Sequence, residues 1–249
     1  MNFDNKIQIL RNTGSCMVTN TSQERFRTYN GVFDNFTNRT LFFLETHGHI
    51  TELSRTLFVG KESNVFTTEV DDEHRLVKIY RVQNCDFKQM YRLILQDPRF
   101  RNIRHRPREV IFTWAQREYT NLLKAKEAGV RVPTMYAWRN HILVEELIGD
   151  PAPRLKDAVI DNLQECADDI LENYRKLYGA GIVHGDLSGF NMLYHENKVW
   201  FIDFSQGISI QSDYAQEYLR RDLVNVQRFF HKRGLTLDIE HMVNFVTKV

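Results

Sequence analysis

The stretch IVHGDLSGFNMLY, residues 182–194, and the following VWFIDF, residues 199–204, indicate the fold more clearly than any other part of the chain. His184, Asp186 and Asn191 lie within eight residues between apolar runs, and a further apolar run leads to Asp203. We expect the intervening residues to form a β-hairpin that returns Asp203 to the side of Asn191. Taken singly, each residue is also typical of a turn or a strand cap. The combined spacing, H-G-D-x-x-x-x-N and then I-D-F, favours a functional site over separate turn and cap residues.

The side chains of Asp186, Asn191 and Asp203 suit phosphoryl transfer. The carboxylate of Asp186 can orient or deprotonate an attacking hydroxyl. The amide oxygen of Asn191 and the carboxylate of Asp203 can hold Mg²⁺, or Mn²⁺, against phosphates. We therefore take Asp186 as a candidate catalytic residue, and Asn191 and Asp203 as candidate metal ligands.

A lysine in the first half of the chain can supply the opposite wall of such a site. Lys78 lies in LVKIY, with apolar neighbours on both sides, and a lysine that faces a core needs an anion because a buried unpaired ammonium is costly. On an edge strand it would instead point outward to water. Of the glutamates on the next predicted helix, Glu118 is central and is the favoured partner, with Glu109 and Glu127 as alternatives.

Two further segments are candidates for nucleotide contacts. The first is a turn between two β-rich runs, formed by Gly60, Lys61, Glu62 and Ser63. Its backbone amides and the Ser63 hydroxyl can cover phosphates, although one glycine is equally typical of a plain β-turn. The second is VEELIGD, where Glu146 and Ile148 would present backbone groups to an adenine ring, since strand groups alternate with period two. A strand followed by a linker is the simpler interpretation and is compatible with this one.

The chain changes character along its length. Residues 1–148 contain a weakly patterned lead-in, a short helix near 38–48, β-rich runs and one long amphipathic helix, whereas residues 149–249 are predicted to be mostly helical around one hairpin. Residues 84–108 form an insert that ends in an arginine-rich block, which we expect to be solvated and mobile. The pattern predicts an α+β fold with a β-rich lobe, an α-rich lobe and a ligand cleft between them.

Composition indicates an ordinary globular protein. The chain has 249 residues, is 42% hydrophobic and has a net charge of +1, so we expect neither a membrane nor a DNA partner. It has no apolar run long enough to span a bilayer, and we expect no signal peptide, because the apolar stretch in MNFDNKIQILRN is too short. The three cysteines lack paired spacing and predict neither a zinc site nor disulfides, which favours an intracellular, cytoplasmic location.

The segments VGKESNVF, VKIYR, REYTNLLKAKEAGV, VHGDLSGFNMLY and FIDFSQG resemble the RIO family of atypical protein kinases. The chain is most similar to the RIO-one branch, through NRTLFFLETHGHITELSRTLFVGKES and PREVIFTWAQREYTNL. The other major branch would bring a winged-helix domain before Gly60, for which there is too little chain. The resemblance runs from about residue 36 to the end of the chain, and the small size is typical of archaeal members.

The resemblance implies a two-lobed protein-kinase-like fold with ATP between the lobes, and Mg²⁺ or Mn²⁺ as the metal. The implied roles are phosphate binding by Lys78 with Glu118 as its partner, adenine contacts at Glu146 and Ile148, base catalysis by Asp186, and metal binding by Asn191 and Asp203. In this family the aspartate matching Asp203 is also thought to accept a phosphoryl group as an acyl phosphate. The family acts in maturation of the small ribosomal subunit, as an ATPase-like switch.

The chain departs from ordinary protein kinases in ways that bear on its acceptor. Gly185 stands where the arginine of H-R-D would be, and Ser188 replaces a lysine that often follows the catalytic aspartate. About ten residues separate Asp203 from the next predicted helix near Tyr214, which leaves no room for a long activation segment. We therefore expect weak activity on peptides in trans, with ATP hydrolysis or self-phosphorylation as the natural reactions.

Two other departures are from the RIO family itself. Gly189 follows DLS where the family often has glutamate, and Glu145 precedes the presumed adenine-binding strand end where an apolar residue is more usual. We also hypothesise that the arginine-rich segment 99–108 binds the pre-small-ribosomal-subunit particle through its ribosomal RNA.

Two other function classes remain as alternatives. Small-molecule kinases that resemble aminoglycoside and choline phosphotransferases share HGDL and a following IDF, but the GKESNVF turn, the arginine-rich insert and IDFSQ argue against them. A non-catalytic module that uses nucleotide as a structural ligand is the other alternative. The complete set of Lys78, Asp186, Asn191 and Asp203 argues against it.

Overall fold

The computed structural model describes residues 33–83 and 85–248, so the predicted lead-in lies almost entirely outside the described residues. The chain divides into two compact units, residues 1–43 and 44–249. Helix α3 (Asn35–Thr46) begins after Asp34, whose carboxylate accepts hydrogen bonds from the amide and hydroxyl of Thr37, both at 2.8 Å. The short helix predicted near 38–48 is therefore present and starts three residues earlier. The remaining description concerns the second unit.

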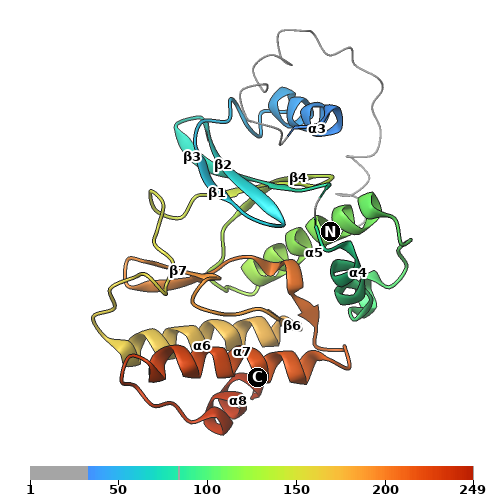
Figure 1. Ribbon diagram of the computed structural model, residues 1–249. Helices are drawn as coiled ribbons and strands as arrows, with labels where there is room; N and C mark the ends of the chain where they lie inside the picture. Colours follow the sequence, from blue (N-terminus) through green and yellow to red (C-terminus); the bar gives the residue numbers. More distant parts are fainter. Residues whose placement is uncertain (1–32, 84, 249) are drawn as a thin grey trace. The chain divides into compact units, whose positions relative to one another are not determined.

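Its first part is an antiparallel five-stranded sheet in the order β1-β2-β3-β5-β4 (Figure 1). The strands are β1 (Thr56–Val59), β2 (Ser63–Val70), β3 (Glu73–Tyr80), β4 (Met135–Arg139) and β5 (Ile142–Glu146). Strand β3 is central, because it pairs with β2 on one side and β5 on the other. The β-rich runs predicted within residues 1–148 are therefore present, as an antiparallel sheet in which β4 and β5 form a hairpin.

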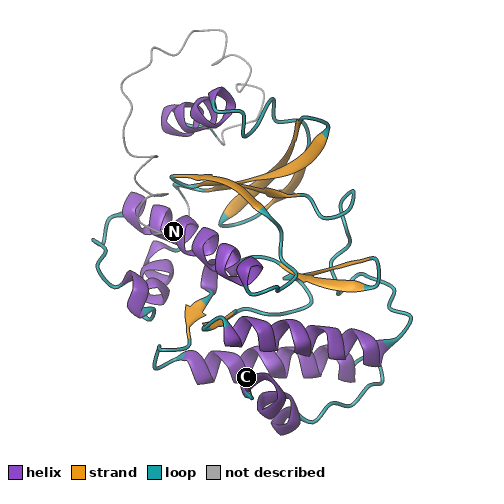
Figure 2. Cartoon of the chain, turned by 180° about the vertical axis from the view of Figure 1, so that it is seen from behind, coloured by secondary structure: helices purple, strands orange, loops and turns teal. Residues whose placement is uncertain are grey.

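Helix α5 (Pro107–Glu127) covers one face of this sheet. Pro107 is at the first helical position, where its missing N–H removes no helical hydrogen bond. Trp114 and Ile111 of the helix share an apolar cluster with Tyr80 and Leu143 of the sheet. Figures 1 and 2 both place α5 between the sheet and the helical part of the chain.

The insert contains regular structure within its described residues. Helix α4 (Phe87–Leu95) begins at Asp86, which accepts a hydrogen bond from the Gln89 amide at 3.0 Å, and a 3-10 turn η2 (Pro98–Phe100) follows. Beyond it the side chains of Arg101, Arg104 and Arg106 are exposed, as expected for an arginine-rich block.

The rest of the unit is mainly helical. Its elements are α6 (Leu163–Gly179), β6 (Ile182–Val183), β7 (Met192–His195), β8 (Lys198–Phe201), η3 (Phe204–Gln206), β9 (Ile208–Ser209), α7 (Ala215–His231) and α8 (Ile239–Thr247). One apolar core joins them and includes Tyr174, Phe201 and Phe230. The predicted helices and the predicted hairpin are present (Figure 2).

Two strand pairs position the polar loops. Strands β7 and β8 form the hairpin, and the Ile202 amide donates to the Asn191 carbonyl at 3.0 Å. Strand β6 pairs with β9, with Val183 opposite Ile208. The loop before β7 and the loop after β8 therefore lie side by side. Among the helices of the described residues, none combines the length and apolar character that crossing a membrane requires.

Candidate active site

His184 connects the loop before β7 to the end of β8. Its imidazole is fully buried and its Nε2 lies 3.0 Å from the Ile202 carbonyl oxygen, to which it donates. Burial lowers the pKa of His184 to about 4, so the ring is neutral at pH 7. The histidine of the H-G-D sequence therefore connects the two loops and carries no charge that could bind a ligand.

Gly185 has a backbone conformation that only glycine adopts readily. Its φ is +78°, and a Cβ at this position would lie 2.7 Å from the carbonyl oxygen of Gln206. The two polar loops approach each other here too closely for any side chain. This explains why the position of the H-R-D arginine is occupied by glycine.

Asp222 on α7 binds the backbone of the same loop. It is fully buried and accepts hydrogen bonds from the amides of Gly185 and Leu187, at 2.7 and 2.9 Å, and from the Tyr174 hydroxyl at 2.6 Å. Its neighbour Arg221 donates to the Gly185 carbonyl. Asp222 was not predicted from the sequence. The signal that could have revealed it is an acid within the apolar stripe of α7 at helical spacing.

Asp186 is partly buried in the same loop. Asn191 donates from its Nδ2 to the Asp186 backbone carbonyl at 2.9 Å and to its carboxylate at 3.1 Å, and Gln206 donates to the same carboxylate oxygen at 3.3 Å. Burial, together with the charge of Asp203, raises the pKa of Asp186 to about 6. At pH 7 the group is therefore mostly ionised and close to the range that suits a general base.

Lys78 joins the sheet to the loop after β8. Its ammonium lies 2.7 Å from Glu118 Oε1 and 3.2 Å from Asp203 Oδ1, and only 7% of the residue is exposed. The alternative of an outward-pointing lysine on an edge strand is wrong, because β3 is central. Burial opposes the charge of Lys78, but Asp203 and Glu118 outweigh it and raise the lysine pKa well above its usual value.

Glu118 is fully buried on α5 and is the glutamate that reaches Lys78, as expected for a central helix position. The Tyr80 hydroxyl donates to its other oxygen. The alternative partner Glu109 instead accepts from the Arg104 amide at 3.3 Å.

Asp203 has a left-handed backbone conformation, with φ 61° and ψ 70°, which is uncommon for a residue other than glycine. Its Oδ1 accepts a hydrogen bond from the Ser205 hydroxyl at 2.8 Å in addition to the contact with Lys78. Burial favours the neutral acid, but Lys78 and the Ser205 hydrogen bond outweigh it and lower the pKa of Asp203. The carboxylate is thus held in its ionised form.

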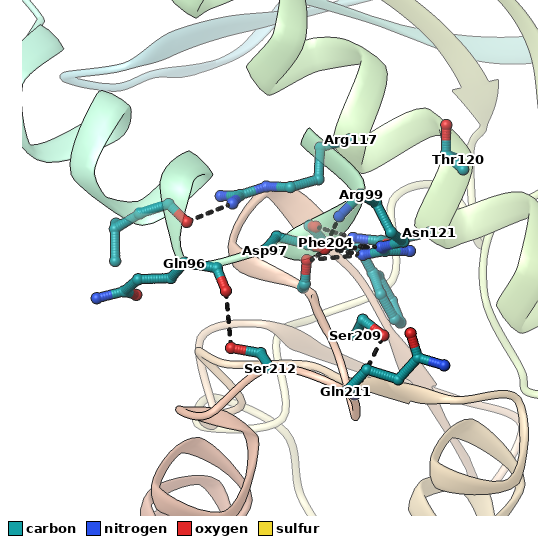
Figure 3. A network of polar contacts seen from close by, with 12 residues as sticks. Gln96, Asp97, Arg99, Arg117, Thr120, Asn121, Phe204, Ser209, Gln211 and Ser212 are labelled. Atoms are coloured by element: carbon teal, nitrogen blue, oxygen red, sulfur yellow. Dashed lines mark hydrogen bonds and ion pairs between the residues drawn. The ribbon is translucent and has the colours of Figure 1, made fainter. Parts of the chain in front are cut away.

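Helix α5 also holds the turn that follows Asp203. Arg117, fully buried beside Glu118, donates to the Ser205 carbonyl at 2.6 Å. Asn121 donates to the carbonyls of Phe204 and Gly207, at 3.1 and 2.8 Å (Figure 3). Two buried polar residues of α5, Arg117 and Asn121, therefore fix the backbone that follows Asp203, and neither was predicted from the sequence.

The inner end of the insert reaches the same turn. Asp97, fully buried, binds Arg99 at 2.6 Å, and Arg99 lies 3.4 Å from the Gly207 carbonyl that it donates to (Figure 3). Nearby, the Ser212 hydroxyl donates to the Gln96 carbonyl at 2.7 Å. Arg117 donates to the Leu93 carbonyl of α4 at 3.0 Å, so it bridges the insert and the turn.

The turn at 60–63 closes on itself, with the Gly60 amide donating to the Ser63 carbonyl at 2.9 Å. Ser63 lies opposite Tyr80 in the sheet, which places its side chain on the same face as Lys78. Lys61 and Glu62 are exposed. Although Glu62 is exposed over part of its surface, partial desolvation of its carboxyl group and the charge of Asp203 raise its pKa, which is consistent with a carboxyl group that faces the site.

The predicted adenine-binding residues lie at the end of β5. The Glu146 amide donates to the Thr134 carbonyl at 2.9 Å, and its carboxylate accepts from the amide and hydroxyl of Thr134 at 2.9 and 2.6 Å. Ile148 is buried and its carbonyl accepts from the Ala152 amide at 2.6 Å. Within residues 33–83 and 85–248 the Ile148 amide has no hydrogen-bond partner. The Glu146 carbonyl and the Ile148 amide thus remain as the candidate backbone contacts.

The donor set around Asp203 fits a hard divalent cation. Asn191 uses its Nδ2 toward Asp186, which leaves its Oδ1 oxygen, and Asp203 uses Oδ1, which leaves Oδ2; in the described part of the chain neither oxygen has a partner. Residues 33–83 and 85–248 contain no cluster of three or more His, Cys, Asp or Glu side chains able to hold a metal ion. A cation bound here would complete its shell with phosphate and water, as Mg²⁺ commonly does.

A five-stranded sheet with a Lys–Glu pair, placed over a helical part that carries the two polar loops, defines a protein-kinase-like fold. A family model described as the RIO domain matches residues 64–242. The chain belongs to the RIO family of protein kinases, an ATP-dependent class of enzymes. The family predicted from the sequence is therefore confirmed.

Curated relatives and a solved structure agree with this assignment. The chain is 38% identical over 228 residues to the RIO-type serine/threonine-protein kinase Rio1 of Haloferax volcanii, covering 90% of this chain and 79% of the relative. It is 36% identical to the Rio1 of Methanocaldococcus jannaschii, covering 90% and 78%. The Rio2 kinase–ADP/Mg²⁺–phosphoaspartate complex from Chaetomium thermophilum has a TM-score of 0.70 at 22% identity, covering 89% of this chain and 68% of that one. This likeness confirms the two-lobed kinase-like fold.

Proposed function

We propose that the chain binds ATP with Mg²⁺, or Mn²⁺, and transfers the γ-phosphoryl group to serine or threonine hydroxyls, to its own Asp203 and to water. The observation that carries this proposal is the position of Lys78, which contacts Glu118 and Asp203 at 2.7 and 3.2 Å. A charged lysine between two carboxylates is poised to exchange one of them for phosphate oxygens.

Each residue has a role that follows from its position. Lys78 binds the phosphates, Glu118 orients it, and the turn at 60–63 covers the phosphates with its amides and the Ser63 hydroxyl. The Glu146 carbonyl and the Ile148 amide contact adenine. Asp186 accepts the proton of the attacking hydroxyl. Asn191 and Asp203 would hold the metal ion, which when bound neutralises charge that develops on the phosphates.

The acceptor is most naturally the chain itself or water. Between Asp203 and α7 the backbone forms only η3, β9 and a tight turn, so no extended segment is present there to dock a peptide. A carboxylate oxygen of Asp203 can attack the γ-phosphorus, with cleavage of the bond to the bridging oxygen and departure of ADP. Water then hydrolyses the acyl phosphate and returns the carboxylate. A Rio2 kinase with a related fold was solved as a phosphoaspartate complex, which supports this route.

Incubation with γ-labelled ATP and Mg²⁺ tests the proposal. Label that hydroxylamine releases identifies phospho-Asp203, whereas label stable to acid identifies phosphoserine or phosphothreonine. The D186N variant should lose turnover by at least about a hundredfold and still bind ATP. Undiminished hydrolysis by this variant would show that Asp186 is not the base.

We also propose that the exposed arginines of the insert contact ribosomal RNA of the pre-small-ribosomal-subunit particle, in the cytoplasm. Arg101, Arg104 and Arg106 are exposed and close in sequence, whereas Arg99 is occupied by Asp97. Replacing Arg101, Arg104 and Arg106 together by Ala should weaken particle binding and lower the slope of its salt dependence by about three. Unchanged binding and an unchanged slope would exclude this surface.

A further inference from the structure

Glu145 faces the nucleotide side of the sheet. On β5, Glu145 lies opposite Leu76 of β3. Two residues further along each strand, Leu143 of β5 lies opposite Lys78 of β3. Directly paired residues share a face, and residues two apart on one strand share a face. Glu145 therefore points to the same side as Lys78, while its neighbour Glu146 points to the other side.

The Glu145 carboxyl group has no hydrogen-bond or ion-pair partner in the described part of the chain, although the residue is partly buried. Glu118 by contrast binds Lys78 and Tyr80. Burial raises the pKa of Glu145 to about 8, with Glu118 and Asp203 adding to the rise and Lys78 opposing it. At pH 7 the group is mostly neutral, and a neutral carboxyl offers one O–H donor and one carbonyl acceptor.

The position of Glu145 relative to the base follows from the proposed ATP site, on which this inference rests. The N6 amino group of adenine would donate to the Glu146 carbonyl, and N1 would accept from the Ile148 amide. With N1 at Ile148 and N6 at Glu146, the atoms N1, N6 and N7 follow the chain from Ile148 back toward Glu145. The N6 and N7 edge therefore turns toward Glu145.

We propose that Glu145 is a specificity-determining residue whose carboxyl group donates to adenine N7 and accepts the second N6 hydrogen. Adenine presents one acceptor and one donor on this edge, which match the neutral carboxyl group. Guanine presents two acceptors, O6 and N7, and leaves the carbonyl oxygen of Glu145 facing another oxygen. The amide of glutamine makes the same pair of contacts with adenine.

Equilibrium binding of ATP, 7-deaza-ATP and GTP at pH 7 tests this role. The natural protein should bind ATP about tenfold more tightly than 7-deaza-ATP, which lacks the N7 acceptor. E145Q, of nearly the same shape, should keep that ratio, and E145M should bind ATP and 7-deaza-ATP equally. E69Q is the matched control, because it removes one carboxylate from an exposed position of β2 and should keep all three affinities.

The pH dependence gives a second readout. As pH rises through about 8, Glu145 ionises and loses the proton that it donates to adenine N7, so ATP binding should weaken. The charged groups that face it are Lys78, Glu118 and Asp203, and they are common to the natural protein and E145Q. The difference between the two pH profiles therefore isolates Glu145, and E145Q should lack the loss of affinity above pH 8.

The outcomes separate this inference from the proposed function. Failure of the natural protein to bind ATP would overturn the proposed function. Tight ATP binding with equal affinity for 7-deaza-ATP would overturn the inference alone. If Glu145 acts only on the charge of Lys78, E145Q and E145M will change all three affinities by the same factor, which also overturns it.

Discussion

Gly185 and Gln206 lie so close together that a Cβ on Gly185 would be 2.7 Å from the Gln206 carbonyl oxygen. This contact joins the loop of Asp186 to the loop of Asp203, and it is what aligns the candidate base with the candidate metal ligand. We predict that G185A destabilises the protein by about 2 kcal/mol or more, since it adds a clash to an unfavourable φ. Phosphoryl transfer should fall with it. Urea unfolding and ATP turnover measure the two effects.

G129A is the control for this prediction. Gly129 has a similar φ of +73°, but a Cβ there would meet nothing within 4 Å. Its replacement should cost about 1 kcal/mol for the backbone alone and leave turnover unchanged. Equal effects of the two substitutions would mean that the contact with Gln206 is unimportant.

Asp222 should be among the most sensitive positions of the helical part. D222A would leave the buried amides of Gly185 and Leu187 and the Tyr174 hydroxyl without their acceptor. Each unsatisfied group costs about 1–3 kcal/mol, so we expect a total loss of about 3 kcal/mol or more. Y174F removes one donor to Asp222 and one weak acceptor, 3.3 Å from the His184 amide, but keeps the bonds of Asp222 to Gly185 and Leu187, so it should cost only about 1 kcal/mol. Similar losses for both variants, measured by urea unfolding, would contradict the role given to Asp222.

His184 predicts a loss of stability in acid. The unfolded histidine takes up a proton near its ordinary pKa of 6.5, while the folded one does so only near 4. Between these values the unfolded state binds more protons, so stability is complete above pH 6.5 and falls by about 3 kcal/mol as pH drops to 4. H184Q, which cannot titrate, should show a smaller fall over this window when unfolding is measured at each pH. Parallel curves for the two proteins would exclude His184 as the cause.

The site was predictable where local pattern determines position. The hairpin from Met192 to Phe201 follows from strand and turn residues, and it places Asp203 beside Asn191 without knowledge of the rest of the chain. Glu118 could be chosen because it is central on a long amphipathic helix that must pack on the sheet. In both cases a single element and its neighbour fix the geometry.

Arg117, Asn121 and Asp97 were not predictable in the same way. Arg117 meets Ser205 across 88 positions of sequence, and only the packing of α5 against η3 brings them together. A buried arginine whose partners are backbone carbonyls leaves no matching acid in the sequence to reveal it. The orientation of Glu145 likewise depends on the register between β3 and β5, since a shift of one residue would turn it to the other face.

From the contacts of Asp97 we predict that the insert contributes to the metal site. In D97N the buried carboxylate that binds Arg99 and stabilises the charge of Arg117 is lost. Both arginines donate to carbonyls of the turn after Asp203, so this turn should become less well fixed. We expect a loss of about 3 kcal/mol of stability and several-fold weaker Mg²⁺-dependent binding of ADP, with metal-free ADP binding much less affected.

D86N is the matched control, because it makes the same charge change in the same insert while asparagine still caps α4. Calorimetric titration with and without Mg²⁺ separates the two effects. A D97N protein that is less stable but keeps the natural Mg²⁺ dependence would show that the insert supports the fold and not the metal ligand.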